Sequence, residues 1–177
     1  MALAYNRHEL KIQQIFNDFN DGVLIVDTSY QRRSVWLDRD KVRLIETILM
    51  GLIIPEVYFW DAETDPDTGK TITHIVDGQQ RIKAIAQFIN NEFKLSKDFL
   101  IDQEISEKYG NKYFRDLGND DKILIWTFNL SVVRIKDKNM DEIRNIFYRL
   151  NLTDYSLNDQ EKRHSNTWGL FVDLTKE

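Results

Sequence analysis

The stretch HIVDGQQRIKAIAQF, residues 74–88, decides the fold because it changes from a strand pattern to a helix pattern. Its first apolar residues continue a β-branched run, and its later isoleucines and alanines recur at helical spacing. The sequence therefore predicts a strand over 71–76 and a helix that begins near Gln79. Such a junction needs one turn residue and one cap, whereas residues 77–81, Asp-Gly-Gln-Gln-Arg, are five polar or special residues in a row.

The rest of the chain predicts a mixed α+β domain with a helical C-terminal end. Helices are expected over residues 8–19, from Asp38 to about Gly51, over 140–150 and over 156–174. Strands are expected at 23–27 and 55–60, and residues 122–135 predict one bent strand or two short ones. Strands 55–60 and 71–76 form a predicted hairpin around the loop 61–70, and residues 92–120 give no clear assignment.

Composition is that of a globular protein with a substantial core. The 177 residues are 42% hydrophobic and 30% charged, which excludes a disordered or fibrous chain. The formal net charge is −5, and this balance disfavours broad binding to a nucleic-acid backbone while it still allows a local basic pocket.

Several classes of site are excluded by residue type. The chain has no cysteine, so disulfides, thiolate metal sites and a cysteine nucleophile are ruled out. Its three histidines are too scattered to predict a histidine metal site. No apolar run reaches the length that spans a bilayer, and the N-terminus is too polar for a signal peptide, so we expect a cytoplasmic protein.

The loop 61–70 contains two weak ligand motifs. DTGKT (67–71) resembles the end of a P-loop, but Thr64 stands where that loop has glycine, and a strand follows instead of a helix. DPDTG (65–69) lacks the ligand spacing of a calcium-binding EF-hand. We therefore predict an exposed turn without bound metal or phosphate.

The Asp-Gly-Gln-Gln-Arg junction has the parts of a nucleotide site. A helix N-terminus attracts anions, Gly78 allows a ligand close to the backbone, and Arg81 can bind two phosphate oxygens. Gln79 and Gln80 supply neutral donors and acceptors, and Asp77 can hold a divalent cation directly or through water. Together these residues suit a nucleoside triphosphate with Mg²⁺. The alternative is structural: Asp77 caps the helix, Gly78 makes the turn, and the last three side chains, including Arg81, are exposed.

A second polar stretch, YQRRSVW (30–36), follows another short strand and is expected close to residues 77–81 in space. Tyr30 or Trp36 would stack on a base or pack in the core, with core packing favoured for Trp36. Arg32 or Arg33 would reach phosphate or lie at the surface.

A third stretch, FYRLNLTDYSLNDQEKR (147–163), follows near the C-terminal end. Phe147 and Leu150 are expected in the core. Asn151 is expected to cap a helix, and Glu161 and Arg163 are compatible with an exposed helix face.

The order of four stretches resembles the N-terminal domain of GmrSD-type restriction proteins. They are YQR…W (30–36), LIETILMGLIIPEVYFW (44–60), VDGQQR (76–81) and IFYRLNLTDYSLNDQEKR (146–163). The hallmark of that family is the Asp-Gly-Gln-Gln-Arg box. The resemblance implies a ParB/sulfiredoxin-like fold, a small mixed β-sheet flanked by helices. It also implies nucleotide binding and hydrolysis that license DNA cleavage in bacterial defence against phage carrying modified DNA.

Carried over to this chain, the resemblance implies a nucleotide site at residues 77–81 with Tyr30, Gln31 and Arg32 beside it. Asp77, Gln79, Gln80 and Arg81 are the expected catalytic residues. The arginines would neutralise phosphate charge, Asp77 would place Mg²⁺ or a water, and the glutamines would orient phosphate or the attacking water. No strong general base is obvious, so slow turnover or binding alone is also compatible with these residues. Two alternatives remain: a metal-dependent DNA nuclease, and a non-hydrolysing module that binds nucleotide or modified DNA.

The expected organisation is an N-terminal helix over 1–22, a ParB-like nucleotide-binding core over 23–138, and a C-terminal helical segment over 139–177. Proteins of the resembled family continue into a helical region and often into an HNH-type nuclease domain, and this sequence has no His-Asn-His arrangement. We therefore expect a fragment or a stand-alone module that meets DNA through other domains or a partner nuclease. The sulfiredoxin activity of the fold is excluded because it requires a cysteine.

Overall fold

The structure is a computed structural model that describes residues 5–26, 36–64, 66–136 and 138–150. The chain divides into two compact units, residues 1–138 and residues 139–177, and each is described by itself. Among the described residues, no helix has both the length and the hydropathy needed to cross a lipid bilayer.

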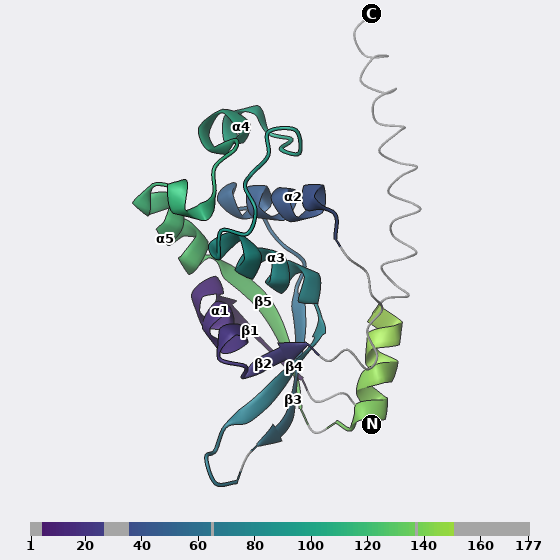
Figure 1. Ribbon diagram of the computed structural model, residues 1–177. Coiled ribbons are helices and arrows are strands. Elements are labelled where there is room, and N and C mark those ends of the chain that lie inside the picture. The colour runs from purple at the N-terminus through teal and green to yellow at the C-terminus, as the bar shows by residue number, and fades with distance from the viewer. Residues whose placement is uncertain (1–4, 27–35, 65, 137, 151–177) are drawn as a thin grey trace, which may run out of the picture. The chain divides into compact units, whose positions relative to one another are not determined.

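A five-stranded mixed sheet forms the centre of the first unit (Figure 1). Its strands are β1 (Tyr5–Lys11), β2 (Leu24–Val26), β3 (Val57–Thr64), β4 (Thr71–Asp77) and β5 (Asn129–Ile135), in the spatial order β1-β5-β3-β4-β2. β3 and β4 form the predicted antiparallel hairpin, which projects away from the helices (Figure 1). β5 pairs in parallel with β3 and antiparallel with β1, and β2 pairs in parallel with β4.

The helices of the first unit are α1 (Ile12–Asn20), α2 (Asp38–Leu49), α3 (Gln79–Ile89), α4 (Gln103–Tyr109) and α5 (Asn119–Thr127), with a 3₁₀ turn, η1, at Phe114–Asp116. The apolar faces of α1, α2 and α3 share one core with Val57, Phe59 and Ile75 of the sheet. In the second unit, residues 140–150 are helical as predicted. The predicted α+β class is therefore confirmed, while the finer ParB/sulfiredoxin-like assignment stays a prediction.

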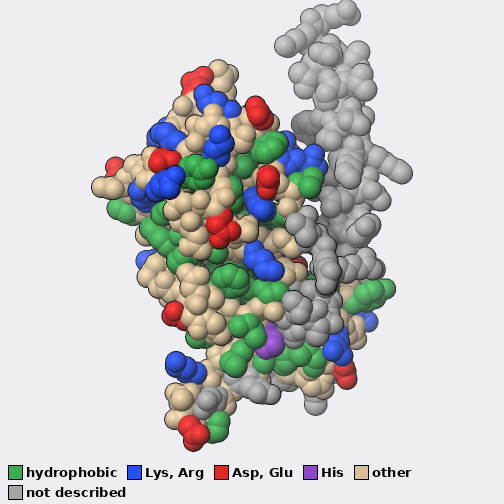
Figure 2. All heavy atoms as spheres, in the orientation of Figure 1, with side chains coloured by type: hydrophobic (Ala, Val, Ile, Leu, Met, Phe, Trp, Pro, Cys, Tyr) green, Lys and Arg blue, Asp and Glu red, His purple; other side chains and the backbone are tan. Residues whose placement is uncertain are grey.

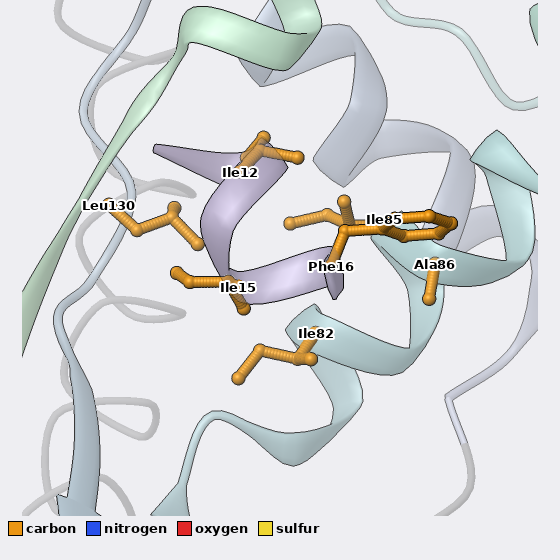
Figure 3. A pocket seen from close by; sticks show the side chains of 7 residues that line it. All are labelled: Ile12, Ile15, Phe16, Ile82, Ile85, Ala86 and Leu130. Atoms are coloured by element: carbon orange, nitrogen blue, oxygen red, sulfur yellow. The ribbon is translucent and has the colours of Figure 1, made fainter. Parts of the chain in front are cut away.

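The packing of α3 on α1 explains why the isoleucines of the opening stretch recur at helical spacing. Figure 3 shows Ile82, Ile85 and Ala86 of α3 facing side chains of α1 and of β5. Together they enclose a wholly apolar cavity of only about 10 Å³, which is at the lower limit for one water molecule. This contact is therefore well-packed core and not a ligand site. Its residues are Ile12, Ile15, Phe16, Ile82, Ile85, Ala86 and Leu130.

Three assignments from the sequence are wrong. Residues 8–11 belong to β1 and not to a helix, because their backbone pairs with β5. Residues 122–127 are the end of α5 and not a strand, although isoleucine, leucine and tryptophan fill them. Two aspartates in the first turn of α5 favour helix through the helix dipole, a signal that the β-prone run outweighed in the prediction. Residues 61–64 extend β3 and do not belong to the loop.

At the C-terminal end of the described chain, Phe147 and Leu150 are half-buried, so the prediction that both are core residues is not confirmed. The fully buried residue of that helix is Ile143. The predicted helix over 156–174 lies outside the described residues.

A buried carboxylate on α2 organises the segment that sequence patterns left unassigned. Glu46 is 4% exposed, and its Oε1 accepts hydrogen bonds from the backbone N–H groups of Ile101 (2.8 Å) and Asp102 (2.7 Å). Asp102 in turn caps α4 by accepting from the Ile105 N–H at 2.9 Å. Hydrogen bonds to a charged acceptor are worth more than neutral ones. Glu46 thus tethers the 99–102 turn to α2 from a distance of more than fifty residues in the sequence.

Replacing this carboxylate should destabilise the protein. Glu46→Ala leaves two partly buried backbone N–H groups without their acceptor, which we expect to cost about 2–4 kcal/mol. Glu46→Gln keeps an acceptor oxygen and should cost about half of that or less. Urea unfolding followed by circular dichroism measures both. Equal stability of all three proteins would show that water satisfies these N–H groups and that Glu46 is not a tether.

Candidate functional site

Gly78 is the turning point between β4 and α3. Its φ of 93° lies in the left-handed region that favours glycine, and its carbonyl accepts the first helical hydrogen bond from Ile82 at 3.0 Å. A Cβ at this position would lie 2.5 Å from Cγ1 of Val57 on the neighbouring strand β3. Gly78 therefore has a structural role, because the absence of a side chain lets α3 begin directly against the sheet.

Gly78→Ala should be strongly destabilising. The positive φ and the clash with Val57 together should cost about 2–4 kcal/mol. Gly69→Ala is a matched control, because Gly69 has a φ of +68° but a methyl group added there would meet no atom within 4 Å. The control isolates backbone strain and should cost about 1 kcal/mol. Urea midpoints decide the matter, and equal losses would show that the approach to Val57 is not restrictive.

Arg81 is held in a fixed position one helical turn after Asp77. Its Nη2 donates to Oδ2 of Asp77 at 2.7 Å and to the backbone carbonyl of Glu56 at 3.3 Å. The side chain of Arg81 is only 15% exposed and that of Asp77 is 29% exposed. The structural alternative, in which Arg81 is an exposed side chain, is therefore wrong, because the end of β4 and the residue before β3 each supply a partner to its guanidinium.

These bonds leave part of the Arg81 guanidinium without a protein partner. Its Nε is buried and makes no hydrogen bond within the described part of the chain. Its Nη1 bonds to none of the described residues, and neither does Oδ1 of Asp77. A donor without a partner is costly, and Nη1, which unlike Nε is not a fully buried atom, is the candidate to receive a ligand.

A second set of polar side chains surrounds this pair. Oε1 of Glu56 accepts from the Tyr58 hydroxyl at 2.6 Å and lies 3.4 Å from Nη2 of Arg7. Tyr58 stands opposite Asp77 in the β3–β4 ladder. Burial, followed by the hydrogen bond to Glu56 and its negative charge, raises the pKa of Tyr58 to about 12, so the phenol stays protonated and acts as a donor. Sequence reasoning missed Arg7, Glu56 and Tyr58, because only the register of the sheet brings them to Asp77.

Arg81 also lines an open groove of about 460 Å³ between α2 and the segment before β3. Drug-sized and cofactor-sized ligands occupy sites of this volume. The groove combines apolar walls with few charged groups. Its lining residues are Trp36, Asp40, Arg43, Leu44, Thr47, Ile53, Ile54, Pro55 and Arg81.

The structure brings together the predicted residues of the Asp-Gly-Gln-Gln-Arg box at one end of β4. Gln79 and Gln80 are half-buried in the first turn of α3. Trp36 packs against the core as favoured from the sequence, and it lines the groove as well. Tyr30, Gln31, Arg32 and Arg33 lie outside the described residues, so their nearness to residues 77–81 stays a prediction. The cap expected at Asn151 and the exposed helix face expected at Glu161 and Arg163 also lie outside the described residues.

The hairpin loop is exposed over residues 66–70 and is flanked by strands. The described residues contain no group of three His, Cys, Asp or Glu side chains that could hold a metal ion by themselves. Asp77 is therefore not part of such a group within the described part of the chain.

The comparison with known families gives one match. The family model described as "GmrSD restriction endonuclease, N-terminal domain" matches residues 12–168, which is most of the chain. No curated protein and no solved structure shows significant similarity to the chain.

Proposed function

The chain belongs to the family of GmrSD restriction endonuclease N-terminal domains, and from this premise we propose that it binds a nucleoside triphosphate and thereby regulates DNA cleavage. The protein is a restriction protein of the defence type. The nucleotide would bind at the β4–α3 junction, around Asp77 and Arg81. Cleavage would reside in other domains or in a partner nuclease.

The observation that carries the proposal is the state of the Arg81 guanidinium. One nitrogen, Nη2, is fixed by Asp77 and Glu56, while Nη1 and Nε have no partner among the described residues. A cation that is already oriented and still has free N–H groups is ready to bind an anion without a large loss of side-chain entropy. It also stands in the first turn of α3, where the helix dipole favours negative charge.

The charge balance of the chain agrees with a small anionic ligand better than with a long nucleic acid. On the face drawn in Figure 2, lysine and arginine side chains are interspersed with aspartate and glutamate. With a net charge of −5, such a surface lacks the broad positive field of a nonspecific DNA-binding protein. We therefore expect affinity for phosphate to come from a local arginine site and not from a broad positive surface.

Hydrolysis is proposed as a positioning reaction. Phosphoryl transfer to water needs mainly orientation and neutralisation of charge. Arg81 would contact the phosphates, and Gln79 or Gln80 would orient the attacking water or a phosphate oxygen. Mg²⁺ would be held by the phosphates and by Asp77, whose Oδ1 accepts no bond from the described residues. When bound, the ion would neutralise phosphate charge.

Arg81→Ala should weaken triphosphate binding by about one to two orders of magnitude, because it removes a charge-assisted contact worth roughly 1.5–3 kcal/mol. Arg81→Lys should restore binding only in part, since a single ammonium must serve both Asp77 and the phosphate. Calorimetric titration with each nucleoside triphosphate and Mg²⁺ measures these affinities.

Lys83→Ala is the control for this titration, because it removes a cation from the same helix at a position outside the groove lining. Circular dichroism must confirm that the variants are folded, since loss of the Asp77 contact should also destabilise the protein by about 1–3 kcal/mol. A folded Arg81→Ala protein with wild-type affinity would refute the proposed site. Binding without release of inorganic phosphate would favour a nucleotide switch over a hydrolase.

A further inference from the structure

The α2 wall of the groove that Arg81 lines carries a second guanidinium with free donors. Nε of Arg43 on α2 donates to the carbonyl of Phe99 at 3.3 Å. Neither Nη1 nor Nη2 of Arg43 bonds to any residue that the structure describes. One helical turn further on, the hydroxyl of Thr47 donates to the Arg43 carbonyl at 2.8 Å, so its oxygen remains an acceptor towards the groove that it lines.

Arg43 is oriented by a tether that is itself buried. The Phe99 carbonyl belongs to the turn whose next N–H groups, at Ile101 and Asp102, are held by the buried carboxylate of Glu46. Glu46 and Arg43 stand on the same helix, three residues apart. The side chain of Arg43 is thus anchored at Nε although the residue is exposed, and this anchor restricts where its terminal nitrogens can lie.

The rest of the lining is mainly apolar. Leu44 and Ile54 are both 7% exposed and form the buried part of the wall, whereas Ile53 is 97% exposed beside them. An apolar side chain so fully in water gains most from being covered by a ligand. A bare polyphosphate cannot use such walls, but a planar base and a ribose can.

The charge of the groove also favours an anionic ligand. Arg43 and Arg81 both line it, against the single lining carboxylate of Asp40. Oδ2 of Asp40 already accepts from the Leu37 N–H at 3.1 Å, and its Oδ1 lies 3.5 Å from Nε of Arg39. Arg81 is neutralised by Asp77 at 2.7 Å, so Arg43 is the lining cation that has no carboxylate partner among the described residues.

We propose that the groove between α2 and residues 53–55 binds the nucleoside part of the triphosphate, with Arg43 as a contact residue for base or ribose and Ile53 as part of the apolar wall. The inference rests on the proposed function, since the phosphates would be held at Arg81, where the groove meets the β4–α3 junction. On this proposal Arg43 would increase the affinity for a nucleotide but not the affinity for a bare polyphosphate. Glu46 then acts as a positioning residue through the Phe99 carbonyl.

The experiment compares inorganic triphosphate with each of the four nucleoside triphosphates, all with Mg²⁺, by calorimetric titration of the full chain. The wild type should bind at least one nucleotide about tenfold or more tightly than inorganic triphosphate. Arg43→Gln should reduce this advantage by about ten- to a hundredfold or abolish it, with the affinity for inorganic triphosphate changed by less than about threefold. Ile53→Ser should reduce the advantage by a smaller factor, and it carries little risk of misfolding because Ile53 is exposed.

Arg39→Gln is the matched control, because it removes the same charge from α2 at a position outside the groove lining. It should leave the nucleotide advantage intact. An unchanged advantage in both Arg43→Gln and Ile53→Ser would overturn the inference. So would a wild type that binds inorganic triphosphate as tightly as every nucleotide.

The proposed function can fail separately. If the wild type binds neither inorganic triphosphate nor any nucleotide, the phosphate site at Arg81 is refuted, and this inference with it. If Arg81→Ala weakens both ligands while the groove variants weaken neither, the phosphate site stands and the nucleoside groove is refuted.

Discussion

The absence of a side chain at position 78 is the constraint on which the rest of the site depends. Because Gly78 meets Val57 across the sheet, α3 can begin one residue after β4 ends and still bury its apolar face against α1. The same close approach brings the first turn of α3 to the carbonyl of Glu56, just before β3. The packing of α3 and the position of Arg81 therefore depend on the same glycine. A larger residue would push α3 away from the sheet and separate Arg81 from its partners.

The local electrostatics follow from that junction. Asp77 and Arg81 neutralise one another at 2.7 Å, so the pair can be half-buried without a large uncompensated charge. Glu56 and Arg7 form a second ion pair at 3.4 Å, in which Arg7 reaches from β1 across β5 to the residue before β3. The Tyr58 hydroxyl donates to the Glu56 carboxylate, and its pKa is raised to about 12. The site is thus nearly neutral in sum, and the proposed affinity for an anion would have to come from oriented N–H groups more than from excess positive charge.

What could be predicted from the sequence was local. The strand-to-helix change near Gln79, the β3–β4 hairpin and the helix from Asp38 all follow from periodicity and turn residues within short windows. The error at residues 8–11 arose because pairing with the distant strand β5 outweighed the helical spacing of apolar residues. The error at 122–127 arose because the aspartates in the first turn of α5 favour a helix despite the β-prone side chains that follow. The other contacts missed from the sequence have the same cause. Glu46 reaches Ile101, and Tyr58 stands opposite Asp77, only because of the tertiary fold.

The hydrogens of Arg81 set a limit on how it can bind phosphate. A guanidinium offers a two-oxygen grip along either of two edges, Nη1 with Nη2 or Nε with Nη2, and both edges include Nη2. Here the two N–H groups of Nη2 are already directed at Asp77 and Glu56. A phosphate could therefore bind through Nη1 alone, and not along a full edge, while Asp77 and Glu56 keep their bonds to Nη2. Mg²⁺ bound at Asp77 would compete for that carboxylate and weaken its hold on Nη2, which opens the full edge to the phosphate. On this reasoning a metal ion and the arginine would be coupled through Asp77. In the proposed complex the ion would do more than neutralise charge, because it would decide which edge of the Arg81 guanidinium is open to the nucleotide.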